Sequence, residues 1–182
     1  MHFRLALLLS VLLASPAIFA GDAAADAALP AGCEAFARDV SGELAAMGTP
    51  SPAVTAGGSG REAVRIAAGR RHDVGLRPLG EVALAAEPGK AMPAGAMAGL
   101  LVFQVPADGR YRVSLGTAHW VDVVDGGRVL ASLDHEGQRG CPLLRKVVEF
   151  ELPGGRDLVL QLVGGAGAAT AVLVTPSAPA AK

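Results

Sequence analysis

The sequence predicts a mainly β protein, namely an antiparallel β-sandwich of jelly-roll type preceded by one amphipathic helix. After residue 61 the chain divides into short apolar runs, and turn-forming pairs such as Asp108-Gly109 and Pro153-Gly154 separate neighbouring runs. These runs recur about every 8 to 12 residues, and no helical pattern alternates with them, which favours antiparallel pairing.

The expected strands follow from this spacing. Residues 110–116 show the strand pattern most clearly, because Tyr111, Val113 and Leu115 alternate with polar side chains. The full set of expected strands is 63–67, 73–79, 81–86, 100–105, 110–116, 120–124, 128–132, 146–152, 158–163 and 169–175.

The N-terminal segment predicts export. Residues 1–20 begin with one basic residue, continue with an apolar run over 5–13 and end in small residues, which is the layout of a cleaved signal peptide. The run is shorter than the roughly 20 residues that span a bilayer, so we expect a periplasmic or secreted protein without a transmembrane segment. We expect no lipid anchor, because Cys33 lies far beyond the apolar run.

The rest of the chain divides by composition. Residues 21–32 are an expected flexible lead-in. Residues 33–47 are the expected helix, because Cys33, Phe36, Val40, Leu44 and Met47 recur at helical spacing. Pro and Gly predict a linker at 48–60, the β-sandwich domain occupies 61–175, and the Ala- and Pro-rich tail 176–182 is expected to be disordered.

Two cysteines in an exported chain predict one disulfide, between Cys33 and Cys141. The closed loop spans 141 − 33 = 108 residues. The chain-entropy model assigns such a loop about 4 to 5 kcal/mol of stabilisation, as an upper estimate.

Composition and motifs argue against several functions. A formal net charge of -1 gives no electrostatic basis for binding nucleic acid, and 4% aromatic residues leave few flat faces for stacking. The chain has no nucleophile elbow and no phosphate loop, and both thiols are expected to be oxidised. We therefore expect no catalytic residues and no cofactor.

Four segments resemble a known family. They are GLLVFQV (99–105), GRYRVSL (109–115), WVDVV (120–124) and KVVEFEL (146–152). This succession is similar to the strands of bacterial pre-peptidase C-terminal domains, over about residues 99–175. The resemblance implies a secreted jelly-roll β-sandwich without catalytic residues.

A second resemblance concerns WVDVV followed by CPLLRK (141–146), which is similar to a group of short exported proteobacterial proteins. Some of that group carry the name homogentisate 1,2-dioxygenase, a cupin-type iron enzyme. Cupin metal sites need an H-x-H pair, because alternating strand positions aim both ligands at one ion. His72, His119 and His135 form no such pair, so we expect no metal site.

Two clusters are candidate ligand surfaces. Asp134, His135 and Glu136 form a polar segment before Cys141, which could hold a ligand or could be a solvated loop. Trp120, with His119 and Tyr111, could offer aromatic faces to a sugar, although a strand Trp is more often a core anchor.

Asp122 interrupts an apolar strand on the same face as Trp120. A buried carboxylate needs a partner, and Arg145 and Lys146 open a later strand. We therefore predict an ion pair between Asp122 and Arg145 or Lys146, close to the disulfide.

These observations favour a non-enzymatic exported accessory or binding module that acts on an envelope protein or glycan. The first alternative is a carbohydrate-binding jelly roll that uses Trp120 and Tyr111. The second is a cupin-type dioxygenase, which would need His72, His119 and His135 to converge with Glu136 or Asp134.

Overall fold

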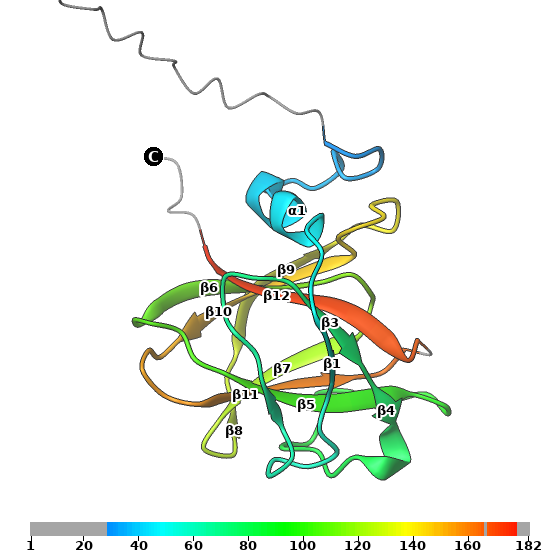
Figure 1. Ribbon diagram of the computed structural model, residues 1–182, viewed down its shortest axis with the longest axis vertical. Coiled ribbons are helices and arrows are strands. Elements are labelled where there is room, and N and C mark those ends of the chain that lie inside the picture. Colours follow the sequence, from blue (N-terminus) through cyan, green and yellow to red (C-terminus); the bar gives the residue numbers. More distant parts are fainter. Residues whose placement is uncertain (1–28, 166, 178–182) are drawn as a thin grey trace, which may run out of the picture.

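A computed structural model describes residues 29–165 and 167–177 (Figure 1). Within these residues the chain forms two sheets and one short α-helix, so the mainly β prediction is confirmed. The predicted signal peptide lies outside the described residues, as do most of the lead-in and the tail. None of the described helices is long and apolar enough to cross a membrane.

The first sheet, here called the β6 sheet, has the order β1-β3-β12-β6-β10-β9. Its strands are β1 (Ala53–Thr55), β3 (His72–Gly75), β6 (Gly109–Leu115), β9 (Ser132–Gly137), β10 (Lys146–Leu152) and β12 (Ala169–Pro176). Four of these strands are close to expected segments, whereas β1 and β9 are additional.

The second sheet, the β11 sheet, has the order β2-β5-β11-β7-β8, and β4 also pairs with β5. Its strands are β2 (Val64–Arg65), β4 (Arg77–Pro78), β5 (Met97–Phe103), β7 (Trp120–Asp125), β8 (Arg128–Val129) and β11 (Leu158–Val163).

One hydrophobic core lies between the sheets. Alternation along each strand turns every second side chain inward, as Val113 and Phe150 do from the β6 sheet and Val123 and Leu160 do from the β11 sheet. All four are almost fully buried, which places the main apolar driving force in this layer.

The antiparallel prediction is only partly right. β1 pairs with β3 in parallel, and β2 pairs with β5 in parallel. The chain visits the other sheet between the two members of each pair, so it returns in the same direction. The remaining named pairings, those that build the centres of both sheets, are antiparallel.

The expected helix over 33–47 is shorter in the structure. α1 spans Ser41–Met47 and lies on the outer face of the β6 sheet (Figure 1). It begins there because the Asp39 side chain accepts the Ser41 N–H and the preceding segment is held to β9. The predicted apolar positions are nevertheless all buried in one cluster with β10 and β12: Cys33, Phe36, Val40, Leu44 and Met47.

The expected linker at 48–60 is part of the fold. It contains β1, and Gly57 exchanges two backbone hydrogen bonds with Leu100 of β5. A Cβ atom at Gly57 would lie 2.3 Å from the Glu62 carbonyl oxygen, so glycine is needed for this close approach. The Gly-rich composition therefore marks tight packing rather than a free linker.

Two further expectations are corrected. The expected strand at 81–86 is instead the end of a 3-10 turn, η1 (Leu79–Glu81), followed by a loop. The expected strand at 128–132 is only β8, and the polar segment 134–136 lies in β9 rather than in a loop. A bulge in β9 beside Glu149 and Phe150 hides the simple alternation of that strand.

Candidate functional site

The two sheets end side by side where the chain passes from β7 and β8 to β9, and a cleft opens at this edge. It consists of two adjoining cavities of about 130 and 310 Å³ that share Trp120, Val121 and Ser132. We call it the Trp120 cleft. The smaller cavity is completed by His135, Lys146 and Val148; the larger is completed by Glu87, Gly89, Asp122, Val129, Leu130, Ala131 and Phe150.

Trp120 separates the cavities. The residue is half-buried, and its indole N–H donates to Asp122 Oδ1 at 2.9 Å. The Nζ atoms of Lys90 and Lys146 lie 5.2 and 5.4 Å from the centroid of its ring, within the range of cation–π attraction. A Cβ atom at Gly89 would lie 3.2 Å from the ring, so the loop backbone packs closely against it. The indole is thus fixed in position by its surroundings.

Asp122 is buried on the outer face of the β11 sheet, and both of its carboxylate oxygens accept hydrogen bonds. Its second oxygen accepts from Gln161 Nε2 at 3.1 Å, and Gln161 lies directly opposite on β11. Gln161 Oε1 in turn accepts the backbone N–H groups of Ala85 and Ala86. Asp122 and Gln161 therefore anchor the loop that follows η1.

The predicted ion pair is not formed, since no salt bridge in the described residues joins Asp122 to Arg145 or Lys146. Asp122 takes its hydrogen bonds from within its own sheet. Lys146 begins β10 in the other sheet, and its Nζ donates to the His119 carbonyl oxygen at 3.3 Å. The sequence could not indicate Gln161 as the partner, because the register of β7 against β11 is a non-local property.

Lys146 has an unusual environment. Burial lowers the pKa of its ammonium below the ordinary value, and the charges of Lys90 and Arg145 lower it further. The nearby Asp122 charge opposes this shift without reversing it. Lys146 therefore carries its charge into the smaller cavity at a cost in solvation.

Asp134, His135 and Glu136 do not act together. His135 faces the smaller cavity, whereas Asp134 and Glu136 face outward and hold Arg38 at 2.6 and 3.0 Å. The pKa of Asp134 is lowered by the His135 N–H and by Arg38. Burial alone would raise the pKa of Glu136, but the Ala37 N–H and Arg38 lower it overall. These two carboxylates attach the N-terminal segment.

The other candidates lie elsewhere. His119 is buried outside both cavities, with Nδ1 2.6 Å from the Thr117 hydroxyl, and burial lowers its pKa although a hydrogen bond from the ring to the Gly167 backbone carbonyl acts in the opposite direction. Tyr111 is in the core, where its hydroxyl donates to the Ala107 carbonyl. Across residues 29–165 and 167–177 no three metal-binding side chains converge, so His72, His119 and His135 are not brought together.

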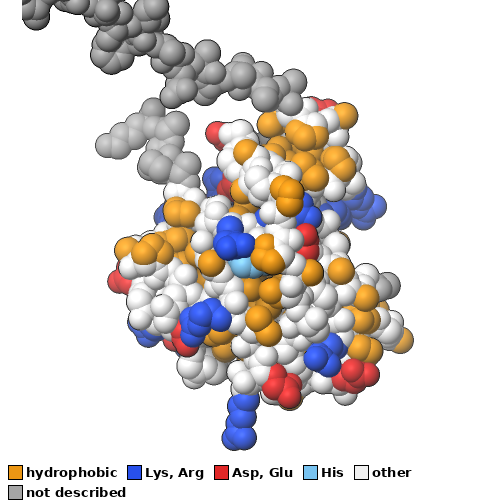
Figure 2. Space-filling model, viewed as in Figure 1, with side chains coloured by type: hydrophobic (Ala, Val, Ile, Leu, Met, Phe, Trp, Pro, Cys, Tyr) orange, Lys and Arg blue, Asp and Glu red, His pale blue; other side chains and the backbone are white. Residues whose placement is uncertain are grey.

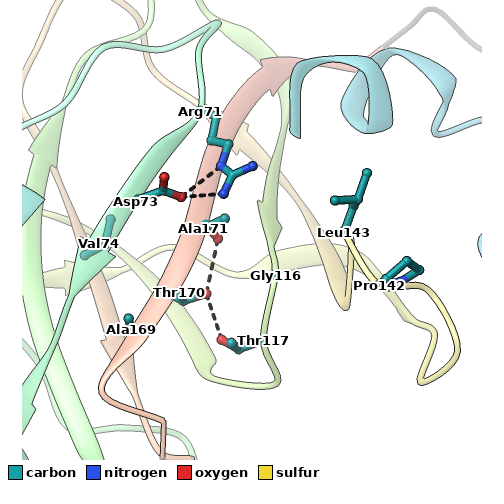
Figure 3. Close-up of a pocket in the computed structure, with 10 residues that line it drawn as sticks. All are labelled: Arg71, Asp73, Val74, Gly116, Thr117, Pro142, Leu143, Ala169, Thr170 and Ala171. Atoms are coloured by element: carbon teal, nitrogen blue, oxygen red, sulfur yellow. Dashed lines mark hydrogen bonds and ion pairs between the residues drawn. The ribbon is translucent and has the colours of Figure 1, made fainter. Parts of the chain in front are cut away.

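A second hollow, of about 370 Å³, lies on the outer face of the β6 sheet (Figure 3). Arg71 and Asp73 are paired there at 2.7 Å, and Arg71 also donates to the Met47 carbonyl. The Thr117 and Thr170 hydroxyls are bonded to each other. Because these polar groups already bond one another, the Trp120 cleft is the better candidate.

The chain is a mainly β protein with a small, partly polar cleft at one edge of its two sheets. No family model matches the chain, and no curated protein matches it. The two resemblances drawn from short strand segments therefore stay predictions. Sequence reasoning did not identify Lys90, Ser132 and Gln161; of these, only Gln161 gave a signal, as a polar residue inside an apolar strand.

Proposed function

We propose that the protein is an exported, non-enzymatic binding module of the cell envelope and that it holds its ligand in the Trp120 cleft. The main support for this proposal is the position of the exposed apolar side chains. Apart from Leu29, the exposed large hydrophobic residues of the described chain are Val129 and Leu133, at 40% and 48% exposure. Val129 lines the larger cavity, whereas Leu133 lines neither cavity and is the residue of β9 after Ser132, which lines both. Apolar surface beside a cleft favours a binding role.

The strand order supports the finer proposal of a jelly roll. The order β3-β12-β6-β10 faces the order β5-β11-β7-β8, and successive strands change sheet except at β4–β5, β7–β8 and β9–β10. A jelly roll of two Greek keys has this arrangement. It is also the fold that the resemblance to pre-peptidase C-terminal domains implies.

The disulfide supports the proposed export, and the positions of Tyr111 and the histidines argue against the two alternative functions. Cys33 and Cys141 are bonded, which fits an oxidising compartment outside the cytoplasm. For the carbohydrate alternative, Tyr111 cannot join Trp120, because it is buried in the core. For the dioxygenase alternative, the required histidines are not brought together in the described residues.

Trp120 makes a direct test convenient, because it is the only Trp in the sequence and its fluorescence reports on the cleft alone. We expect soluble peptidoglycan fragments or neutral envelope oligosaccharides, titrated separately, to produce a saturable change in emission. Val129→Asp combined with Leu133→Asp should weaken binding about tenfold or more, whereas Leu29→Asp should not. If no member of either ligand set changes the emission, the cleft is not the binding site and the proposal fails.

A further inference from the structure

We infer that the smaller cavity of the Trp120 cleft binds a carboxylate group, with the Lys146 ammonium as counter-charge and His135 and Ser132 as flanking hydrogen-bonding groups. The inference rests on the proposed binding function of the cleft and adds the chemical class of its ligand.

Lys146 forms no salt bridge with any of the described residues. Every ion pair among the described residues is made by an arginine: Arg38, Arg65, Arg71, Arg110, Arg112 or Arg156. The carboxylates of β9 and β10 are paired with arginines: Asp134, Glu136, Glu149 and Glu151. Asp122 is bonded to Trp120 and Gln161. The half-buried Lys146 ammonium thus has one long hydrogen bond, to the His119 carbonyl, and a cation–π contact with Trp120. The Asp122 charge acts on it only from beyond salt-bridge distance.

Burial and neighbouring positive charges both disfavour the charged form of Lys146. Charged groups are seldom removed from water without a partner, because the loss of solvation is costly. Lys146 is partly desolvated, and the charges of Lys90 and Arg145 repel its own, which lowers the pKa of Lys146. An anion bound at this point would compensate both effects. Sites poised in this way are more common at functional positions than elsewhere.

The side chains that line the smaller cavity suit an anionic group. Lys146, His135 and Ser132 can each donate a hydrogen bond, Trp120, Val121 and Val148 supply apolar walls, and no carboxylate lines this cavity. A volume of about 130 Å³ is close to four water volumes of about 30 Å³ each. It accommodates a carboxylate and a few attached atoms, and the body of the ligand can extend past Trp120 into the larger cavity.

The test uses a matched set of small molecules and Trp120 fluorescence. D-glucuronate carries a carboxylate on a sugar ring, N-acetylalanine carries one on a peptide-like body, and D-glucose lacks the charge. We expect at least one carboxylate to bind ten times more tightly than glucose. The tighter of the two carboxylates identifies a sugar acid or a peptide carboxylate as the natural source.

Variants assign the effect to Lys146. Lys146→Met removes the charge but keeps a flexible apolar chain beside the indole, so the fold should persist, as a thermal melt can confirm. It should weaken carboxylate binding at least tenfold, and Lys146→Arg should restore part of it. Arg145→Met, the neighbouring charge that does not line the cavity, should change affinity less than twofold.

The outcomes separate the two proposals. If glucose binds as tightly as glucuronate, or if Lys146→Met keeps full affinity for carboxylates, the carboxylate subsite is wrong while the cleft remains a binding site. If the carboxylates leave the emission unchanged while neutral oligosaccharides shift it, the subsite alone fails. If no compound of either test shifts it, both proposals fail.

Discussion

Asp122 shows how a buried charge can be stabilised without an ion pair. Its two oxygens accept one hydrogen bond each from Trp120 and Gln161, and hydrogen bonds to a charged acceptor are stronger than those between neutral groups. Gln161 is held in one orientation, because its oxygen accepts two backbone N–H groups and its amide also donates to the Ala86 carbonyl. Asp122 therefore faces two donors that cannot turn away.

We expect Asp122→Asn to lower the free energy of unfolding by about 1 to 3 kcal/mol, because the new amide NH₂ would face a donor and leave a buried group unpaired. Urea denaturation measures the change. Asp125→Asn is the matched control: its partner Arg156 is 59% exposed, and such pairs contribute about 0 to 1 kcal/mol. Equal losses of stability in the two variants would show that the hydrogen bonds to Asp122 contribute no more than the exposed ion pair of Asp125.

At the level of single residues, the sequence predicted part of the Trp120 cleft. Strict alternation correctly placed Asp122 and Trp120 on one face, because that rule depends only on the strand itself. The partners Gln161 and Lys146 come from other strands, and their positions depend on register and sheet packing, which no local pattern contains.

Among the elements, the N-terminal segment depends most on distant attachments. α1 is only seven residues long, too short to be stable alone. Phe36, Leu44 and Met47 pack against Leu173 and Val147 of the β6 sheet, while Arg38 and the disulfide fix its start. The sequence predicted the buried stripe of this segment. It did not predict the helix start, because Asp39 and Arg38 take part in contacts that interrupt the turn.

Removing the disulfide should therefore loosen this element first. We expect Cys33→Ala with Cys141→Ala to lower the free energy of unfolding by up to about 4 to 5 kcal/mol, because the 108-residue loop is no longer closed. Hydrogen exchange should become faster for amides in residues 33–47 than for those in β6. Unchanged exchange in that segment would mean that packing and Arg38 hold it without the disulfide, and Arg38→Gln in the same background would then show the larger effect.

Across the whole molecule, charge is balanced locally rather than by region. Figure 2 shows basic and acidic side chains mixed on the face that it presents. On the outer face of the β6 sheet, Glu149 lies within 4 Å of Arg38, Arg110 and Arg112, and Arg112 also pairs with Glu43. The amino-acid composition predicted a net charge close to zero. The two-layer arrangement was predictable from strand spacing, whereas the parallel edge pairings depend on chain paths between the sheets.

The lowered pKa values of His119, Asp134 and Glu136 determine how stability depends on pH. Burial lowers the pKa of His119, so the folded protein keeps it neutral below pH 6.5, where an unfolded chain would protonate it. The unfolded state then binds more protons, and stability falls as the pH drops below about 6.5. The lowered pKa values of Asp134 and Glu136 add a second loss below about pH 4.

We therefore expect the free energy of unfolding to rise from pH 3 to pH 7 in two steps, measured by urea denaturation at each pH. His119→Gln should remove the upper step, which begins as the pH falls below about 6.5, because glutamine does not titrate. His135→Gln should retain that step, since His135 faces the Trp120 cleft rather than the buried position beside Thr117. If His119→Gln leaves the upper step intact, the neutral buried His119 is not its source, and a different titrating group must account for the loss.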